Sequence, residues 1–161
     1  MLPLLPFEPE ALGDVTGLDL VHLQCHMGMD ALSWARRGAR VTGLDFSAPA
    51  IGTARGLAER IGVEARFEVA DVYHAVDVLG STYDITYQSL GSLNWHPDMA
   101  RWAGILHALT RPGGRYCLLE GHPMGWVLDD AGEQVEYPYF PVPGGQRISD
   151  DGGTYPDMSA E

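Results

Sequence analysis

The chain has 161 residues, of which 45% are hydrophobic, and a formal net charge of −12 at pH 7. This length and composition predict one globular domain with a single core. Only ten Lys and Arg residues are present and they are spread out, whereas binding to phosphates requires such residues to cluster on one face. The composition therefore excludes nucleic acid and anionic membranes as expected partners and favours a small molecule.

The N-terminal segment 1–6 is apolar, but it lacks a basic region and contains two prolines, so it does not resemble a signal peptide. No apolar run approaches the about 20 residues that a membrane-spanning helix needs. Cys25 and Cys117 lie in apolar surroundings and are expected to be reduced thiols. These features predict a cytoplasmic protein.

Strand and helix signals alternate along the chain. Apolar runs predict buried strands, and apolar residues at helical spacing predict helices between them. Gly13 and Gly62 are expected to end helices, Ser47 to cap one, and Pro97 to occupy the first position of another. Strands are expected over 18–23, 40–44, 65–69, 83–88 and 115–120, and helical segments over 8–12, 28–38, 47–62, 72–79 and 97–109.

This alternation implies right-handed crossovers between parallel strands. A sheet built in this way is buried on both faces. The sequence therefore predicts an α/β fold with three layers and a doubly wound, mostly parallel sheet.

The first strand, the turn at 24–28, the following helix and the second strand form a βαβ unit that ends on Asp45. Such a unit holds an adenosyl group: backbone N–H groups meet the ligand at the helix start, and the strand-end acid accepts both ribose hydroxyls. A surface acid or a helix N-cap is the alternative role for Asp45.

The segment 23–47 contains Leu-Gln-Cys-His-x-Gly-x-Asp and, further on, Val-Thr-Gly-x-Asp-x-Ser. It resembles the opening of a class I S-adenosylmethionine-dependent methyltransferase, in the bacterial branch where Gln and His replace two turn glycines. Segments 67–72, 83–88 and 109–116 are similar to the family's third strand, fourth strand and corner into the fifth strand. The resemblance covers residues 12 to 125 and implies a Rossmann-like methyltransferase fold, S-adenosylmethionine as cofactor and a small-molecule acceptor.

The resemblance implies a role for each part of the cofactor site. The turn is expected to hold the methionine part, with backbone N–H groups on its carboxylate and the Gln24 amide available for its ammonium. Because Gln and His replace glycine, the turn is expected to keep φ negative and to be more open. The expected cofactor-binding residues are Gln24, Cys25, His26 and Gly28 in the turn, Asp45, Phe46 and Ser47 after the second strand, Asp71 and Val72 at the adenine, and Gln88 beneath the sulfonium.

Two of these assignments have local alternatives. Asp71 is also a suitable N-cap for the turn that follows it. His22, Cys25 and His26 resemble metal ligands in type, but no second Cys or His pair stands at a matching spacing. No metal is therefore expected.

Aromatic residues follow the fourth and fifth strands, where an acceptor docks beside the methyl group. Methyl transfer is an in-line displacement whose rate depends on alignment, and it needs a base only if the nucleophile must lose a proton. Glu120 and His122 are the residues expected to serve as that base.

The composition changes near residue 128, which predicts a cofactor-binding domain over 1–128 and an extension over 129–161. The extension holds eight acids against Arg147, with four prolines and five glycines. It is expected to act as a lid or a dimer contact, with an edge strand at 135–140.

The methyltransferase resemblance implies a sixth and an antiparallel seventh strand, and nothing after Glu120 supplies both. The chain is therefore expected to be truncated, with its last strands missing or replaced. An open sheet edge predicts a homodimer or another cover.

Two other functions remain open at this point. One is a binding module of the same fold without turnover. The other is a nicotinamide-dependent oxidoreductase, which is disfavoured because Gln24 and His26 would crowd a diphosphate.

Overall fold

A computed structural model describes residues 4–129 and 131–140. The chain divides into two compact units, the first ending at Leu119 and the second beginning at Glu120. The change in composition near residue 128 therefore lies inside the second unit. Residues 141–161, which make up most of the predicted extension, lie outside the described residues.

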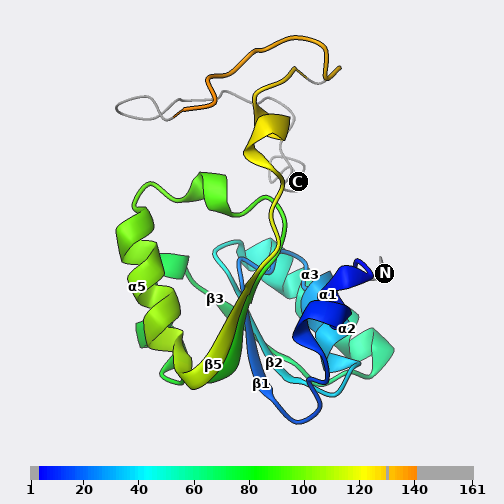
Figure 1. The fold of residues 1–161 in the computed structure, drawn as a ribbon. Coiled ribbons are helices and arrows are strands. Elements are labelled where there is room, and N and C mark those ends of the chain that lie inside the picture. The colour runs from blue at the N-terminus through cyan, green and yellow to red at the C-terminus, as the bar shows by residue number, and fades with distance from the viewer. Residues whose placement is uncertain (1–3, 130, 141–161) are drawn as a thin grey trace. The chain divides into compact units, whose positions relative to one another are not determined.

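The first unit contains a five-stranded parallel sheet with the strand order β3-β2-β1-β4-β5 (Figure 1). The chain moves outward from β1 through β2 and β3, and then outward on the other side through β4 and β5. This is the doubly wound order that places a ligand site at the switch between β1 and β4. The strands are β1 (Asp19–Leu23), β2 (Arg40–Asp45), β3 (Arg66–Val69), β4 (Tyr83–Gln88) and β5 (Thr110–Leu118).

Helices cover both faces of this sheet (Figure 1). One face carries α1 (Phe7–Leu12), α2 (Met29–Ala35) and α3 (Ala48–Ile61). The other face carries α4 (Ala75–Leu79) and α5 (Met99–Leu109). The three predicted layers and the α/β class are confirmed.

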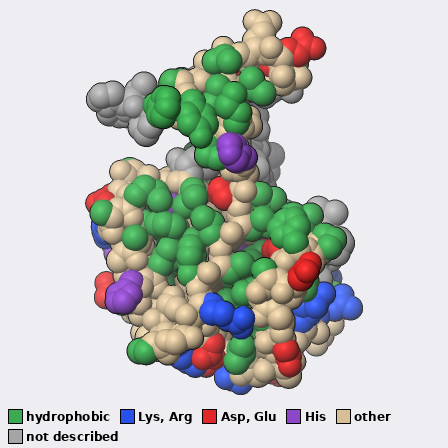
Figure 2. Space-filling model, in the orientation of Figure 1, with side chains coloured by type: hydrophobic (Ala, Val, Ile, Leu, Met, Phe, Trp, Pro, Cys, Tyr) green, Lys and Arg blue, Asp and Glu red, His purple; other side chains and the backbone are tan. Residues whose placement is uncertain are grey.

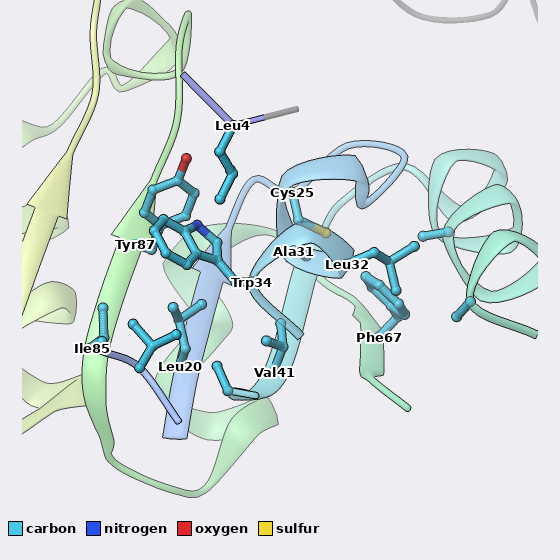
Figure 3. Packing of buried hydrophobic residues seen from close by; sticks show 14 of the residues in the cluster. Leu4, Leu20, Cys25, Ala31, Leu32, Trp34, Val41, Phe67, Ile85 and Tyr87 are labelled. Atoms are coloured by element: carbon cyan, nitrogen blue, oxygen red, sulfur yellow. The ribbon is translucent and has the colours of Figure 1, made fainter. Parts of the chain in front are cut away.

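The side chains of successive β1 residues point to opposite faces of the sheet, as the pleat of a strand requires. Leu20 is buried in one core cluster with Trp34 and Tyr87, whose rings meet edge to face with centroids 5.7 Å apart (Figure 3). Val21 and Leu23 belong to the cluster on the opposite face. A strand with apolar residues on both faces fits a sheet that is covered on both sides.

The predicted ends of α3 are confirmed. The Ser47 hydroxyl accepts a hydrogen bond from Ala50 N at 3.3 Å, so this residue is the N-cap. Gly62 ends the helix in the left-handed conformation, with φ at +65°.

The start of α5 differs from the prediction. Pro97 was expected to be the first helical residue, but the helix begins at Met99. Asp98 is the cap, because its carboxylate accepts a hydrogen bond from Arg101 N at 2.9 Å. A side-chain acceptor next to the proline thus moves the start by two residues.

Strand β5 also differs from the expected range of 115–120, because it begins at Thr110 and ends at Leu118. The Pro-Gly-Gly sequence at 112–114 is typical of a turn, yet this stretch lies in the strand, where its pairing with β4 shifts register. A Cβ added at Gly114 would lie 2.8 Å from Arg111 O. Glycine therefore permits a close backbone approach here.

Arginine and aspartate side chains connect the strands near their starting ends. Arg111 binds Asp84 and Asp19 at 2.7 and 2.9 Å, and Arg40 binds the other oxygen of Asp19 at 2.7 Å. Figure 2 shows blue side chains gathered toward this end of the unit on the face in view. These ion pairs join β1, β2, β4 and β5 at the end opposite to the ligand site.

The described part of the second unit contains a short 3₁₀ helix over Pro123–Trp126 and a single antiparallel bridge between Leu128 and Val135. The expected strand at 135–140 is not formed. No strand follows β5 in the described part of the chain. Among the described residues, no helix is long and apolar enough to cross a membrane.

Candidate active site

A cavity of about 560 Å³ opens at the carboxyl ends of β1 and β4. This is the position where open parallel sheets bind their ligands. Its wall combines the turn after β1, the first residues of α2, the end of β4 and part of the N-terminal segment. The lining residues are Leu5, Glu8, Gln24, Cys25, His26, Met27, Met29, Asp30, Ser89, Leu90 and Leu119.

The turn after β1 has the backbone of a glycine-rich turn, although only one of its three key positions is glycine. Gln24 and His26 have φ values of +55° and +49°, and Gly28 has +73°. The prediction of negative φ was therefore wrong, and the prediction of a more open turn loses the reason on which it rested. The left-handed conformation costs a non-glycine residue about 1–2 kcal/mol, so the surrounding contacts must compensate for it.

Gly28 is required for a second reason, which is close packing. A Cβ at this position would lie 2.8 Å from both Ala54 Cβ and a ring carbon of Phe67. The turn thus sits directly on α3 and β3, which fixes the start of α2 at the edge of the cavity.

Asp45 stabilises the left-handed turn. Its Oδ2 accepts a hydrogen bond from His26 N at 2.8 Å, and its Oδ1 accepts one from Ser47 N at 2.9 Å. The side chain is 1% exposed. A carboxylate has about four lone-pair sites, so these two bonds leave two unused, but Asp45 is not among the residues that line the cavity. The predicted contact with ribose stays a prediction.

Gln24 and Gln88 form the end of a buried amide network. Gln88 Nε2 donates to Gln24 Oε1 and lies 3.2 Å from His96 Nε2, while Tyr116 donates to Gln88 Oε1 at 3.1 Å. The Gln24 oxygen accepts one hydrogen bond and keeps a second lone pair, while the Gln24 NH₂ group suits a carboxylate. The predicted contact of the Gln24 amide with the ammonium stays a prediction.

Two carboxylates line the cavity that were not among the predicted site residues, Glu8 and Asp30. Glu8 is 4% exposed and accepts hydrogen bonds from the Tyr87 hydroxyl and from Leu5 N. Burial raises the pKa of Asp30 above its usual value, and a hydrogen bond with Ser89 opposes that shift. Two acids near one cavity favour a ligand that carries positive charge.

His22 contacts Ser89, one of the residues that line the cavity. Its Nε2 lies 3.0 Å from the Ser89 hydroxyl, and its ring packs edge to face on Tyr87. Burial lowers the pKa of His22 to about 3, so the ring is neutral at pH 7. The described residues contain no group of three His, Cys, Asp or Glu side chains that could hold a metal ion.

Comparison with protein families matches residues 12–114 to the family described as "Methyltransferase domain", which is more than half of the chain. The chain belongs to this methyltransferase family. It is 30% identical over 138 residues to the ubiquinone biosynthesis O-methyltransferase of Sodalis glossinidius, an alignment that covers 84% of this chain and 54% of that protein. The chain thus spans about half the length of the curated relatives it matches.

Solved structures agree with this assignment. An S-adenosylmethionine-dependent methyltransferase from Mesorhizobium loti matches with a TM-score of 0.66 and 27% identity, over 76% of this chain and 56% of that one. The magnesium protoporphyrin IX methyltransferase of Synechocystis, crystallised with S-adenosylmethionine, matches with a TM-score of 0.55 and 25% identity, over 63% and 49%. The predicted methyltransferase family and its Rossmann-like fold are confirmed.

The residues predicted to bind the adenosyl part of the cofactor follow β2 and β3. Phe46 is 59% exposed, and Ser47 caps α3. Asp71 caps a 3₁₀ turn through a 2.8 Å hydrogen bond from Tyr73 N, and Val72 is buried. Asp71 therefore has the structural role that was its alternative, and its contact with adenine stays a prediction.

Cys25 lies in the methyltransferase turn, but its thiol belongs to the core (Figure 3). It is 4% exposed, and burial raises the pKa of the thiol far above its usual value. A thiol held in this form is inert as a nucleophile and as a metal ligand. Cys25 thus contributes packing and backbone to the turn.

The two residues predicted to act as a base lie in the second unit, where each makes a local contact. Glu120 accepts a hydrogen bond from Gly121 N at 2.9 Å, and His122 Nδ1 accepts one from Met124 N at 3.2 Å. The structure brings together Gln24, His26, Asp45 and Gln88, whereas a catalytic role for Glu120 and His122 stays a prediction.

Glu8 and Asp30 differ in the signals that the sequence carries for them. Asp30 is the last residue of the Leu-Gln-Cys-His-x-Gly-x-Asp motif and lies in the first turn of α2, where an acid is common and did not by itself predict a ligand contact. Glu8 lies in α1, which precedes the whole βαβ unit. Only the packing of α1 against β4 brings Glu8 to the same cavity.

Proposed function

We propose that this protein is an S-adenosylmethionine-dependent methyltransferase that acts on a small-molecule acceptor. The observation that carries the proposal is the cavity at the switch between β1 and β4. A left-handed turn lines this cavity, and the Asp45 carboxylate holds the backbone of the turn. Family membership and the resemblance of the turn support the same conclusion.

The residues around the cavity fit the amino acid end of this cofactor. Gln24 offers amide N–H groups to a carboxylate, and the backbone N–H groups at the start of α2 do the same. Asp30 and Glu8 suit an ammonium. The cofactor, when bound, supplies an electrophilic methyl group on a sulfonium.

The chain's own residues then act mainly by positioning. The Asp45 carboxylate fixes the turn and offers its free lone pairs to the ribose hydroxyls. Gln88 is buried at the end of β4, and Ser89, which follows it, lines the cavity. Alignment of this kind contributes a large part of the rate in a displacement at carbon.

We propose an acceptor with a hydroxyl group, because the relative from Sodalis glossinidius is named an O-methyltransferase. Glu120 or His122 would then take the hydroxyl proton. The net charge of −12 supports an acceptor other than nucleic acid. Little or no retention on immobilised tRNA, at low salt or at high salt, is the expected result.

Two further proposals concern the surroundings of the enzyme. The free Cys25 and Cys117 thiols support a cytoplasmic location. The edge of β5, where Tyr116 and Leu118 are partly exposed, supports a homodimer or cover by the extension over 129–161. Sedimentation of a well-folded monomer, with rapid hydrogen exchange along residues 116–120, would contradict this cover.

Calorimetric titration tests the proposed function directly. S-Adenosylmethionine and S-adenosylhomocysteine are expected to bind with one site per chain, while NAD is expected not to bind, since Gln24 and His26 crowd a diphosphate. Binding of NAD without binding of either sulfur compound would replace the methyltransferase proposal with the oxidoreductase. Binding of the cofactor without turnover on any hydroxyl acceptor would favour a binding module.

A further inference from the structure

His96 is a buried histidine that the proposed function does not use. It follows the 3₁₀ turn Leu93–Trp95 after β4 and is 9% exposed. Its ring stacks at a tilt on Trp102, with centroids 5.2 Å apart, and meets Tyr73 edge to face at 5.9 Å. These contacts hold the ring in place, so its Nε2 keeps a fixed position beside Gln88.

The hydrogen bonds around Gln88 allow two proton patterns. In the pattern of this structure, Tyr116 donates to Gln88 Oε1, and Gln88 Nε2 donates to Gln24 Oε1 and to His96 Nε2. His96 Nε2 accepts only if it carries no proton, so the ring proton is on Nδ1. In this pattern the Gln24 NH₂ group is free toward the cavity.

In the second pattern, the Gln88 and Gln24 side-chain amides are both turned over, so that each exchanges its oxygen with its NH₂ group. If His96 Nε2 carries a proton, it must donate, and Gln88 must turn its oxygen toward His96 and Gln24. Gln24 then donates to Gln88 and presents its own oxygen to the cavity. The proton on one buried nitrogen thus selects between a donor and an acceptor in the wall of the cofactor site.

We propose that His96 is a positioning residue for the cofactor turn: its unprotonated Nε2 sets Gln88, and through Gln88 it directs the Gln24 NH₂ group toward the cofactor carboxylate. This inference rests on the proposed function, because it takes the cofactor to be the ligand of the cavity. His96 acts through two amides and does not itself line the cavity.

The charges around His96 set the pH at which the pattern changes. Burial lowers the pKa of His96 below its usual value, and Asp71 opposes that shift. The other titratable neighbours are Tyr73, on the ring edge, and Tyr116, on Gln88. Arg101 lies over the Tyr73 ring at 4.7 Å, and Asp98 shares a hydrogen bond with the Tyr73 hydroxyl.

Protonation of His96 is therefore expected below pH 6.5. The favourable Gln24 orientation is present above that pKa and is lost as the pH falls through it. Affinity for S-adenosylhomocysteine is expected to fall about tenfold across this step, the size of one hydrogen bond to a charged group exchanged for a repulsive contact.

The experiment measures the affinity of S-adenosylhomocysteine by calorimetry from pH 4.5 to 8 for three variants and the wild type. His96→Gln keeps an acceptor and cannot gain a charge, so near-normal affinity at pH 8 and a smaller acidic step than in the wild type are expected, the remainder belonging to Asp30. His96→Leu offers no acceptor, so weaker binding at every pH and the same smaller step are expected. His107→Gln, at an exposed site on α5, is the matched control and is expected to keep the wild-type step.

A second readout does not depend on the ligand. Nitrogen-15 NMR of the ligand-free protein is expected to show the Nδ1-protonated form of His96 at pH 8, and circular dichroism confirms that each variant is folded. Should His96→Leu fail to fold, the comparison of His96→Gln with wild type and the NMR assignment still decide the matter.

Three results would overturn the inference. The first is an acidic step that is as large in His96→Gln as in the wild type, which would assign it to another group such as Asp30, whose pKa burial raises. The second is an Nε2-protonated ring at pH 8. The third is wild-type protein that does not bind S-adenosylhomocysteine at all, which would overturn the proposed function as well, whereas the first two leave that function standing.

Discussion

The two ends of the parallel strands are built from different chemistry. At the starting end, Arg111 and Arg40 neutralise Asp19 and Asp84 through ion pairs that are open to solvent. At the carboxyl end, the Gln24 and Gln88 amides bond to each other, and among the described residues Asp45 and Glu8 accept hydrogen bonds from neutral donors.

The difference is visible in two aspartates. A hydrogen bond from Arg40 lowers the pKa of Asp19 below its usual value, whereas burial raises the pKa of Asp30. The first carboxylate already has its cations, but the second has none among its described neighbours. Buried carboxylates without a neighbouring cation, such as Asp30, are typical of ligand sites. The starting end therefore contributes to stability, and the carboxyl end is prepared for a ligand.

The largest effect is expected from Asp45→Ala. The change leaves His26 N and Ser47 N without their acceptor and removes the group proposed for ribose. Affinity for S-adenosylhomocysteine is expected to fall by about 1.5–3 kcal/mol, measured by calorimetry. Asp45→Asn keeps one acceptor oxygen and is expected to lose less. Equal affinity in the wild type and in Asp45→Ala would remove Asp45 from the site.

Asp30→Asn is expected to have the next largest effect on affinity, and a ligand without the amino group serves as the matched comparison. S-Adenosylhomocysteine is expected to bind about tenfold more weakly, because the ammonium loses a charged partner. An analogue in which hydrogen replaces the amino group is expected to bind the variant and the wild type equally. Asp77→Asn, at an exposed position of α4, is the control. An equal loss with both ligands would show that Asp30 acts on the fold instead.

A smaller effect is expected from the backbone of the turn. His26→Ala and His26→Gly both remove the imidazole, but only alanine is strained at φ +49°. The glycine variant is expected to be about 1 kcal/mol more stable than the alanine variant, measured by urea unfolding. Alanine and glycine variants of equal stability would mean that the turn relaxes to negative φ.

The smallest effect is expected at the starting end. Arg111→Gln removes exposed ion pairs with Asp84 and Asp19, and such pairs contribute little to stability. The midpoint of thermal unfolding is expected to fall slightly, more clearly at pH 7 than at acidic pH, where protonated Asp19 no longer pairs. Affinity for S-adenosylhomocysteine is expected to be unchanged. A clear loss of affinity would show that the two ends of the strands are coupled.

The sequence determined the order of strands and helices, because apolar runs and glycine stops are local signals. It also pointed to the turn at 24–28 and to Asp45, since a strand-end acid after a βα turn has a recognisable spacing. The ends of elements were less certain where a tertiary contact decided them. Pairing with β4 drew Thr110 and the Pro-Gly-Gly stretch into β5 against their turn propensity.

Only the tertiary structure decided the conformation of Gln24 and His26. Their side chains favour negative φ, but the buried Asp45 carboxylate and the Gln88 amide hold the turn in the left-handed form. It also brought Glu8 to the cavity from a helix outside the βαβ unit. Contacts between residues far apart in the chain carry these energies, and no local pattern encodes them.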